Sequence, residues 1–512
     1  MDFLTGVGSS HGGQRSLRQP LIDDAADESF VVMGASRPAT VDVEEQASLR
    51  RQTYADQLFE DELAQQQQRG EEEEEELNPP FKDDERRQMT PAGGVFTLMA
   101  SMLGGAMLTL PFATARIGIG LSLLISLLSA LASESTYFFL VQAARDTRAN
   151  TYHSIGQAYL GRGGKVVSMV SLVCLCLFAS AGYLLLLGLL VGEIATHDGS
   201  APPRRLKNII SVLFAAFLAP LSASKSLHAL RYSNMMSVIA AVLLLTSVLV
   251  ESARQGKGFY PSKRLDDESI KWYTTDFKDI MYAVPFFVGA YMAHFSLLSV
   301  HAELVQPTKA RVRGVIRVTI FSAWVLYSVI GVLGYMYALD KTCDSIFSNL
   351  PKDVLTVFGR IGLSATLAFS YPLFIVPCRV TLRDLFLSWR GVEEEAARGD
   401  GDRGRLEWEA WFDTDTVRRT LTVAIVLVST TVACILPSVA LFVSLVGATV
   451  GAILALLLPS IFYLKMSSWR QTLGYKVLSV FLIAVALFVM VGGTWTSVSH
   501  AMDDPCEEQQ VG

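Results

Sequence analysis

The sequence predicts an all-α integral membrane protein that crosses the bilayer as eleven transmembrane helices. The chain has 512 residues, of which 51% are hydrophobic and 18% are charged. The hydrophobic residues are clustered in eleven segments, each long enough or nearly long enough to span a bilayer as a helix. The charged residues are concentrated instead in a long N-terminal segment and in the connections between the hydrophobic segments.

Most of the eleven spans are unambiguous, and two leave the total open. The two shortest, 207–223 and 419–437, make a count of ten or twelve possible. Spans 9 and 10 almost run together through Leu436-Pro437-Ser438. The predicted spans are, in chain order, 93–115, 117–143, 165–193, 207–223, 228–251, 277–299, 313–337, 352–378, 419–437, 438–463 and 474–497.

The first span interrupts itself in the middle. It reads GGVFTLMASMLGGAMLTLPFATA, so Gly104-Gly105 lies at mid-depth and Pro111 follows shortly after. Glycine and proline weaken a helix and leave backbone groups unpaired, which is tolerated in a membrane only inside protein or along a watery cavity. A helix broken at the midplane is how many secondary transporters build a solute site. The alternative is a kinked packing helix whose glycine pair permits close contact.

The first 90 residues differ in composition from the rest. They contain 21 acidic and 9 basic residues, a net charge of −12, whereas the whole chain is −6. This composition, with the run Glu71–Glu76, predicts a disordered acidic tail over 1–90, ahead of a membrane domain over 91–498. With the tail in the cytosol, the inner connections carry 21 Lys/Arg against 12 outside, so the N-terminus is predicted to be cytosolic and the C-terminus outside or lumenal.

The same orientation places the remaining charged segments. Residues 379–418 become a cytosolic loop, and its amphipathic start, Arg379–Trp389, is expected to lie along the membrane surface. Residues 499–512 become a short non-cytosolic tail. Cys343 and Cys506 both fall on this outer side, where a disulfide between them is possible. The other four cysteines, Cys174, Cys176, Cys378 and Cys434, fall in spans and are expected to be packing residues.

Residues 436–465 contain three short motifs in one order, namely Ser444–Thr449 (SLVGAT), Pro459 and Phe462–Lys465 (FYLK). This segment resembles the tenth-span signature of the amino acid/auxin permease superfamily. The chain is similar over about 92–497 to the branch of the sodium-coupled neutral amino acid transporters and the vacuolar amino acid transporters of fungi and plants. The other matching segments are 219–237, 151–165, 294–304 and Arg379 after Pro377.

The resemblance implies an amino acid transporter with a LeuT-type fold, a five-plus-five inverted repeat plus one extra helix. Spans 1 and 6 would then be the broken helices, and spans 1, 2, 6 and 7 would rock against the rest in alternating access. The free amides of Leu103, Gly104, Gly105 and Ala106 would bind a substrate carboxylate. Carbonyls near Gly289-Ala290-Tyr291 would suit an α-ammonium group. Selectivity would come from Met102, Tyr183, Phe286 and Tyr371, although aromatic residues at helical spacing are also common in plain cores.

Ion coupling departs from the sodium-coupled branch. Sodium-coupled members use an Asn in span 1 and hydroxyls in span 8, whereas Ala100 stands at the Asn position here and Ser370 remains in span 8. Loss of one oxygen ligand weakens a hard-cation site, unless Ser101 or backbone oxygens compensate. Sodium-independent transport is therefore favoured, either proton-coupled or facilitative.

Three residues are candidate proton carriers, namely His294, Glu134 and Glu303. Each also has an ordinary interpretation: His294 as a satisfied core histidine, Glu134 as a partner within the bundle and Glu303 as a helix cap. Arg360 in span 8 also needs a partner, because a charge at depth is costly. Pairing with Glu134 is one option, and snorkelling to the interface is the other.

No feature of the sequence indicates an enzyme. No metal-ligand cluster and no nucleophile–base arrangement is present, Gly161–Lys165 lacks Walker spacing, and no cofactor is expected. The expected partners are an amino acid, H⁺ as a possible coupling ion and the lipid bilayer, with no nucleic acid. An alternative is an amino acid sensor that signals through its acidic tail to a cytosolic partner. An endomembrane of vacuolar or lysosomal type and the plasma membrane both remain open, and the residue types do not reveal which amino acid is carried.

Overall fold

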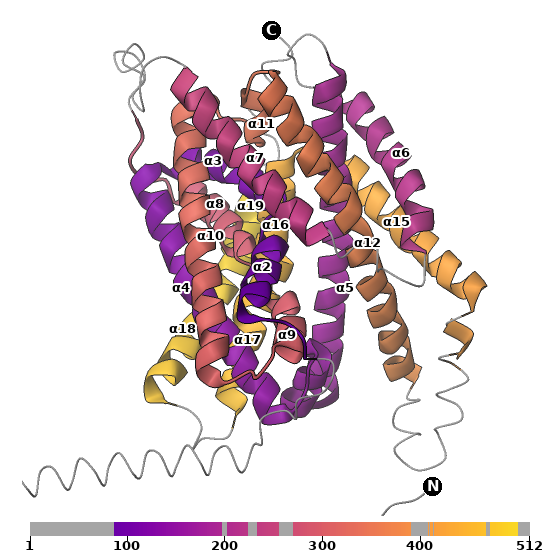
Figure 1. Cartoon of the computed structure of the whole chain (residues 1–512). Coiled ribbons are helices and arrows are strands. Elements are labelled where there is room, and N and C mark those ends of the chain that lie inside the picture. Colours follow the sequence, from indigo (N-terminus) through magenta and orange to yellow (C-terminus); the bar gives the residue numbers. More distant parts are fainter. Residues whose placement is uncertain are drawn as a thin grey trace, which may run out of the picture. The chain divides into compact units, whose positions relative to one another are not determined.

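The computed structural model describes residues 87–196, 202–223, 233–254, 270–390, 408, 410–412, 414–466 and 472–499. Nearly all of the described chain is helical (Figure 1). The predicted acidic tail lies outside the described residues except for its last four, and so do most of the 379–418 loop beyond Arg390 and the C-terminal tail beyond Ser499.

The prediction of an all-α protein with eleven spans is confirmed. Ten helical segments in the described ranges are long and apolar enough to cross a membrane, and a bent pair of helices supplies the eleventh. The first six spans are formed by α2 (Pro91–Met102) with α3 (Ala106–Ile117), α4 (Ile119–Thr147), α5 (Tyr152–Ala195), α6 (Arg204–Ser222), α7 (Ser233–Arg254) and α8 (Phe277–Ala290) with α9 (His294–Glu303). The last five are α10 (Lys309–Ala338), α12 (Val354–Arg390), α15 (Asp415–Ile435), the segment α16 (Val439–Val446), η3 (Gly447–Gly451), η4 (Ile453–Leu457) and α17 (Leu458–Lys465), and the segment α18 (Leu473–Phe488), η6 (Val489–Gly493) and α19 (Thr494–Ser499).

Local sequence explains where several helices begin. Thr90 caps α2 by accepting a hydrogen bond from the Gly93 amide at 3.1 Å, and Pro91 follows at the first helical position. Asp276 caps α8 in the same way, accepting from the Lys278 amide at 2.8 Å. These side chains satisfy amides that a helix start leaves unpaired, so they fix the register of the two broken spans.

Two helices differ from the prediction. Residues 379–389 continue α12 up to Arg390 and so extend the helix of span 8, whereas a separate cytosolic loop was expected to begin at Arg379. That they lie along the membrane surface stays a prediction. Pro372 and Pro377 are accommodated within this helix. The segment predicted to precede span 3 is itself helical and joins α5 through Gly161, whose φ of 64° and ψ of −154° interrupt the helix and separate the amphipathic start from the span.

Two groups of helices can be defined by their contacts, and α7 and span 10 contact both of them. One group contains α2, α3, α4, α8, α9 and α10, which are spans 1, 2, 6 and 7, and these helices contact one another extensively. The other group contains α5, α6, α12 and α15, which are spans 3, 4, 8 and 9. That the first group moves as a bundle against the second as a scaffold stays a prediction, as does the inverted repeat.

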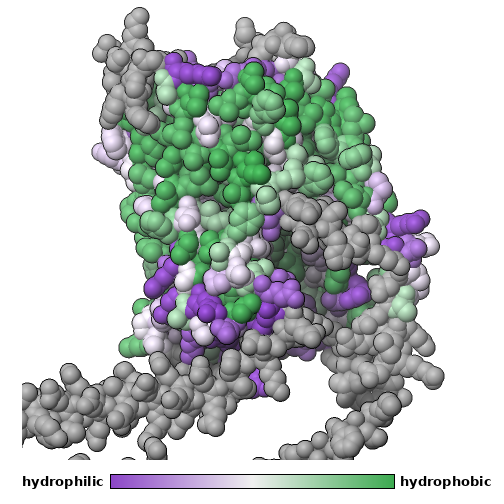
Figure 2. Space-filling view, in the orientation of Figure 1, coloured by the Kyte–Doolittle hydropathy of each residue, from purple (hydrophilic) through white to green (hydrophobic). Residues whose placement is uncertain are grey.

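On the face that Figure 2 shows, the helical region is apolar across its middle and hydrophilic toward its ends. Large apolar side chains are exposed on several of the helices, including Leu213, Phe217, Phe321, Val477 and Val491. In water such a surface would be unfavourable, but it is what a bilayer requires. The protein is therefore a multi-pass membrane protein.

The Arg360 side chain does not form an ion pair with Glu134, and it does not snorkel to the lipid interface. Its Nε lies 3.0 Å from Oε2 of Glu193 at the end of α5, and both side chains are almost completely buried, at 1% and 2% exposure. Both earlier options for Arg360 are therefore wrong. The physical reason is the close packing of α5 on α12, which brings the two charges together away from solvent.

The cysteines partly follow expectation. Cys174, Cys176, Cys378 and Cys434 are free thiols in or beside the helical core. Cys343 is disulfide-bonded, and its partner lies outside the described residues. The pairing of Cys343 with Cys506 stays a prediction.

Candidate functional site

The first span breaks where the glycine pair predicts it. Helix α2 ends at Met102, α3 begins at Ala106, and the two helices meet at 61°. The expectation of a free Leu103 amide is wrong, because this amide donates to the Met99 carbonyl at 2.9 Å and closes the last turn of α2. Within the part of the chain that the structure describes, no hydrogen bond occupies the amides of Gly104 and Gly105. These amides stand at the N-terminus of α3, where the helix dipole adds partial positive charge. The break can therefore accept an anionic group without a nearby arginine.

Tyr183 of α5 lies across from this break. A side-chain Cβ placed on Gly104 would be 3.8 Å from the Tyr183 hydroxyl oxygen, and one placed on Gly105 would be 2.2 Å from Leu186 Cδ1. Gly105 thus lets α3 approach α5 closely, and Gly104 lies opposite the Tyr183 hydroxyl, with room for a Cβ in ordinary van der Waals contact. The structure brings together the predicted residues Gly104 and Tyr183 from the two packing groups.

Span 6 breaks between Ala290 and His294, as expected from the resemblance. The Ala290 carbonyl accepts a hydrogen bond from the Tyr327 hydroxyl at 3.2 Å, and the Tyr291 carbonyl accepts one from the Tyr137 hydroxyl at 2.8 Å. The carbonyls proposed for an α-ammonium group are thus partly occupied by tyrosines. Because a carbonyl oxygen has two lone pairs, each can still accept one more hydrogen bond.

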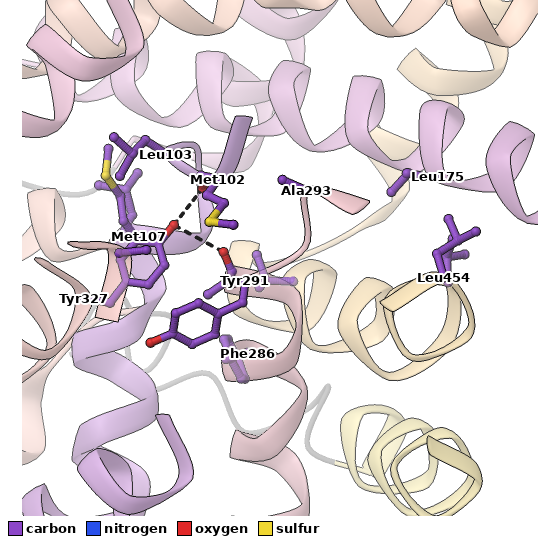
Figure 3. Packing of buried hydrophobic residues seen from close by; sticks show 14 of the residues in the cluster. Met102, Leu103, Met107, Leu175, Phe286, Tyr291, Ala293, Tyr327 and Leu454 are labelled. Atoms are coloured by element: carbon purple, nitrogen blue, oxygen red, sulfur yellow. Dashed lines mark hydrogen bonds between the residues drawn. The ribbon is translucent and has the colours of Figure 1, made fainter. Parts of the chain in front are cut away.

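Tyr137 and Tyr327 are site residues that sequence reasoning missed. Tyr137 of α4 also accepts a hydrogen bond from the Ala293 amide at 2.8 Å, and Tyr327 of α10 also donates to the Met102 carbonyl at 2.8 Å. Figure 3 shows Tyr327 reaching toward both breaks. A tyrosine deep in an apolar span needs a partner for its hydroxyl, and this requirement was the available signal.

The other predicted substrate residues are distributed over both groups. Met102 and Phe286 are buried near the two breaks, with Phe286 packed against Phe112 and Tyr282. The Tyr291 side chain is fully buried, and its hydroxyl lies 2.8 Å from Ser126 Oγ. It is therefore held within the bundle by α4.

Ser370 and Tyr371 lie on α12, in the scaffold group. Both are buried, and the Tyr371 hydroxyl lies 3.0 Å from Ser429 Oγ of α15. This hydrogen bond joins two scaffold helices. The participation of Ser370 and Tyr371 in binding stays a prediction.

The three coupling candidates occupy different environments. His294 is fully buried at the start of α9, and its Nε2 atom lies 2.8 Å from Thr136 Oγ1. Its ring centroid lies 4.1 Å from that of Tyr137, with the two rings tilted by 56°, and its Nδ1 atom has no partner in the described chain. Glu134 instead forms a partly exposed ion pair with Arg317 at 3.0 Å. Glu303 is the last residue of α9. Of the three, only His294 adjoins a helix break.

The span 10 motif serves close packing against span 6. A Cβ on Gly447 would lie 2.1 Å from the Pro285 carbonyl oxygen, and one on Gly289 would lie 3.5 Å from the Gly447 Cα. Ser444 donates a hydrogen bond to the Tyr282 carbonyl at 3.2 Å. The SLVGAT segment therefore holds the backbone of span 10 directly against α8.

Replacing Gly447 by alanine is expected to lower stability by about 1–3 kcal/mol, because the new methyl group would overlap the fixed Pro285 carbonyl. The effect should appear as a lower midpoint of thermal denaturation for the detergent-purified protein. Gly314→Ala on α10 is the control, since its Cβ would meet no atom within 4 Å. Equal midpoints for the two variants would contradict the proposed backbone contact.

Comparison with known proteins decides the family. The family described as "Transmembrane amino acid transporter protein" matches residues 87–499, which is most of the chain. The chain belongs to this amino acid transporter family. The resemblance noted from the span 10 and span 6 motifs is thereby confirmed.

Relatives of this chain come from animals and plants. "Solute carrier family 38 member 10" of Pongo abelii is 22% identical over 419 residues, which cover 81% of this chain and 35% of that protein. The protein of the same name from Homo sapiens is 22% identical over 426 residues, covering 82% of this chain and 36% of that protein. "Amino acid transporter AVT6A" of Arabidopsis thaliana is 22% identical over 420 residues, with 77% and 85% covered. The chain therefore spans about a third of the length of the two solute carrier relatives.

Proposed function

We propose that this protein is a secondary amino acid transporter that works by alternating access and does not require sodium. The observation that carries the proposal is the pair of broken helices, with free amides at Gly104 and Gly105, inside a member of an amino acid transporter family. The names of its relatives from animals and plants support the same class of substrate.

The two ends of an amino acid would be bound by different parts of the site. Its carboxylate would accept hydrogen bonds from the amides of Gly104 and Gly105, where the N-terminus of α3 favours negative charge. Its ammonium group would approach the carbonyls beside Gly289 and Tyr291 through lone pairs that the tyrosines leave open. Tyr183, facing Gly104 from α5, would contact the substrate from the scaffold side.

Transport would follow from movement between the two packing groups. A substrate held between the Gly104 break and Tyr183 contacts both the bundle and the scaffold. Rocking of one group against the other would then open the site to each side of the membrane in turn.

Sodium independence rests on the oxygen atoms near span 1. Ala100 offers no side-chain ligand, so span 1 lacks the side-chain oxygen that the Asn of sodium-coupled members would supply. A hard cation needs several oxygen ligands, so this region is a poor sodium site. Proton coupling would use His294, which is buried beside the span 6 break; without such coupling the protein would be a uniporter.

The test is uptake of a panel of radiolabelled amino acids into proteoliposomes, with sodium, without sodium and with an imposed pH gradient. Saturable flux that ignores sodium is expected. Stimulation by the pH gradient would assign proton coupling, and its loss in His294→Gln would assign the coupling residue. Strict sodium dependence would contradict the coupling proposal. Binding without flux for every amino acid would instead favour the sensor.

The orientation and location of the transporter complete the proposal. The Lys/Arg bias places the N-terminus in the cytosol and the C-terminus outside or in the lumen. The acidic tail would then meet cytosolic partners, and the membrane would be an endomembrane of vacuolar or lysosomal type or the plasma membrane.

A further inference from the structure

The carbonyl ends of two half-helices converge on a single hydroxyl group. Met102 is the last residue of α2, and Ala290 is the last residue of α8. The carbonyl oxygens of both accept hydrogen bonds from the Tyr327 hydroxyl, at 2.8 and 3.2 Å (Figure 3). All three residues are at most 4% exposed, so bulk water does not solvate this point.

Two helix C-termini that meet in a buried place need a cation or a hydrogen-bond donor between them. The C-terminus of a helix carries unpaired carbonyl oxygens and a partial negative charge, and two such ends that meet in a buried place repel each other. In transporters built from broken helices, carbonyls at half-helix ends commonly coordinate a monovalent cation. Here one phenolic proton is shared between the two carbonyls instead.

We infer that Tyr327 is a positioning residue that takes the place of a cation between the two helix breaks. This inference rests on the proposed transport function, because it explains how the two breaks are held in a binding arrangement without sodium. The hydroxyl neutralises part of the converging negative charge and fixes the end of α2 relative to the end of α8. Removing it should misplace the neighbouring amides of Gly104 and Gly105.

Tyr137 supplies further hydrogen bonds to the backbone of the break in span 6. Its hydroxyl donates to the Tyr291 carbonyl and accepts from the Ala293 amide, both at 2.8 Å. Together the two tyrosines satisfy three backbone groups of the interrupted span 6. Tyr137 lies on α4 and Tyr327 lies on α10, and neither helix is broken. Both tyrosines that bond to the backbone of the two breaks therefore belong to the same packing group as the breaks.

The decisive variant is Tyr327→Phe, which keeps the aromatic ring and removes only the hydroxyl. The matched control is Tyr335→Phe, a buried tyrosine of the same helix whose hydroxyl accepts a hydrogen bond from the Lys271 amide, away from the breaks. For each purified protein, thermal stability would be measured in sodium, lithium, potassium and choline chloride. Initial rates of amino acid uptake would be measured in parallel.

The wild-type protein and Tyr335→Phe are expected to denature at the same temperature in all four salts. Tyr327→Phe is expected to lose at least about tenfold in uptake rate. Its denaturation midpoint should rise in sodium or lithium relative to choline, because a small cation can then bind the Met102 and Ala290 carbonyl oxygens that the hydroxyl no longer satisfies.

Two outcomes would overturn the inference. One is sodium stabilisation of the wild-type protein, and the other is a folded Tyr327→Phe variant whose stability does not respond to any cation. If Tyr327→Phe does not fold, the sodium titration of the wild-type protein still decides. The thermal measurement needs no transport, so a wild-type protein that carries no amino acid would count against the proposed function alone.

Discussion

Replacing Gly104 by valine is expected to abolish amino acid uptake while leaving the protein folded and in the membrane. The Cβ atom at this position would make only ordinary contact, 3.8 Å from the Tyr183 hydroxyl, so the backbone can accept it. The isopropyl group would, however, fill the space in front of the free amides. A loss of at least about 100-fold in uptake rate is expected, because the substrate can no longer approach the geometry that transport requires.

The measurement compares initial uptake rates in proteoliposomes that contain equal amounts of monodisperse protein. Gly163→Val on α5 serves as the control, since a Cβ at Gly163 would meet no atom within 4 Å. Saturable uptake by Gly104→Val at the wild-type rate would exclude this break as the substrate site.

Replacing Arg360 by methionine is expected to destabilise the protein by about 3–5 kcal/mol, because it leaves the buried Glu193 carboxylate without its cation. More than the ion pair would be lost. Arg360 also donates hydrogen bonds to the carbonyls of Phe347 and Leu350, at 2.5 and 3.1 Å, and Ser348 donates to the same glutamate at 2.5 Å. The pair thus attaches the short helix α11 (Ile346–Asn349) to α5 and α12.

A double-mutant cycle separates the pair from the rest. Arg360→Met combined with Glu193→Gln should be less destabilised than the sum of the two single variants, because no unpaired charge remains buried. The readout is the denaturation midpoint of the detergent-purified proteins. Additive effects of the two substitutions would show that the charges do not interact as described.

Hydropathy was sufficient to predict the eleven spans, since each membrane helix must be apolar over its own length. The break at Gly104-Gly105 could also be predicted from the sequence, because it depends on the residues at that point alone. The length of α12 could not be predicted, because the amphipathic pattern of residues 379–389 fits a surface helix as well as an extension of span 8. The local residue pattern predicts the secondary structure of a segment more reliably than it predicts the orientation of that segment.

The partners of buried polar groups were the least predictable feature. Pairing with Glu134 was one of two options for Arg360, but the glutamate that reaches it is Glu193, near the end of α5 and 167 residues away in the chain. Tyr137 and Tyr327 were missed for a related reason. Their partners are backbone atoms of helix breaks more than a hundred residues away or on a different helix, and no residue type marks a carbonyl as available.

Helix α2 is attached to span 6 at both of its ends, and this limits how it can travel. At its carbonyl end, Tyr327 joins Met102 to the end of α8. Just before its amide end, Met89 exchanges two backbone hydrogen bonds with the end of α9, through the Glu303 carbonyl at 2.9 Å and the Val305 amide at 3.0 Å. Arg87 adds contacts to the carbonyls of His301 and Leu304. The two halves of span 6 and the first half of span 1 therefore form a closed loop of linked segments, and a tilt of α2 must be shared by α9 unless the Met89 pairing is first undone.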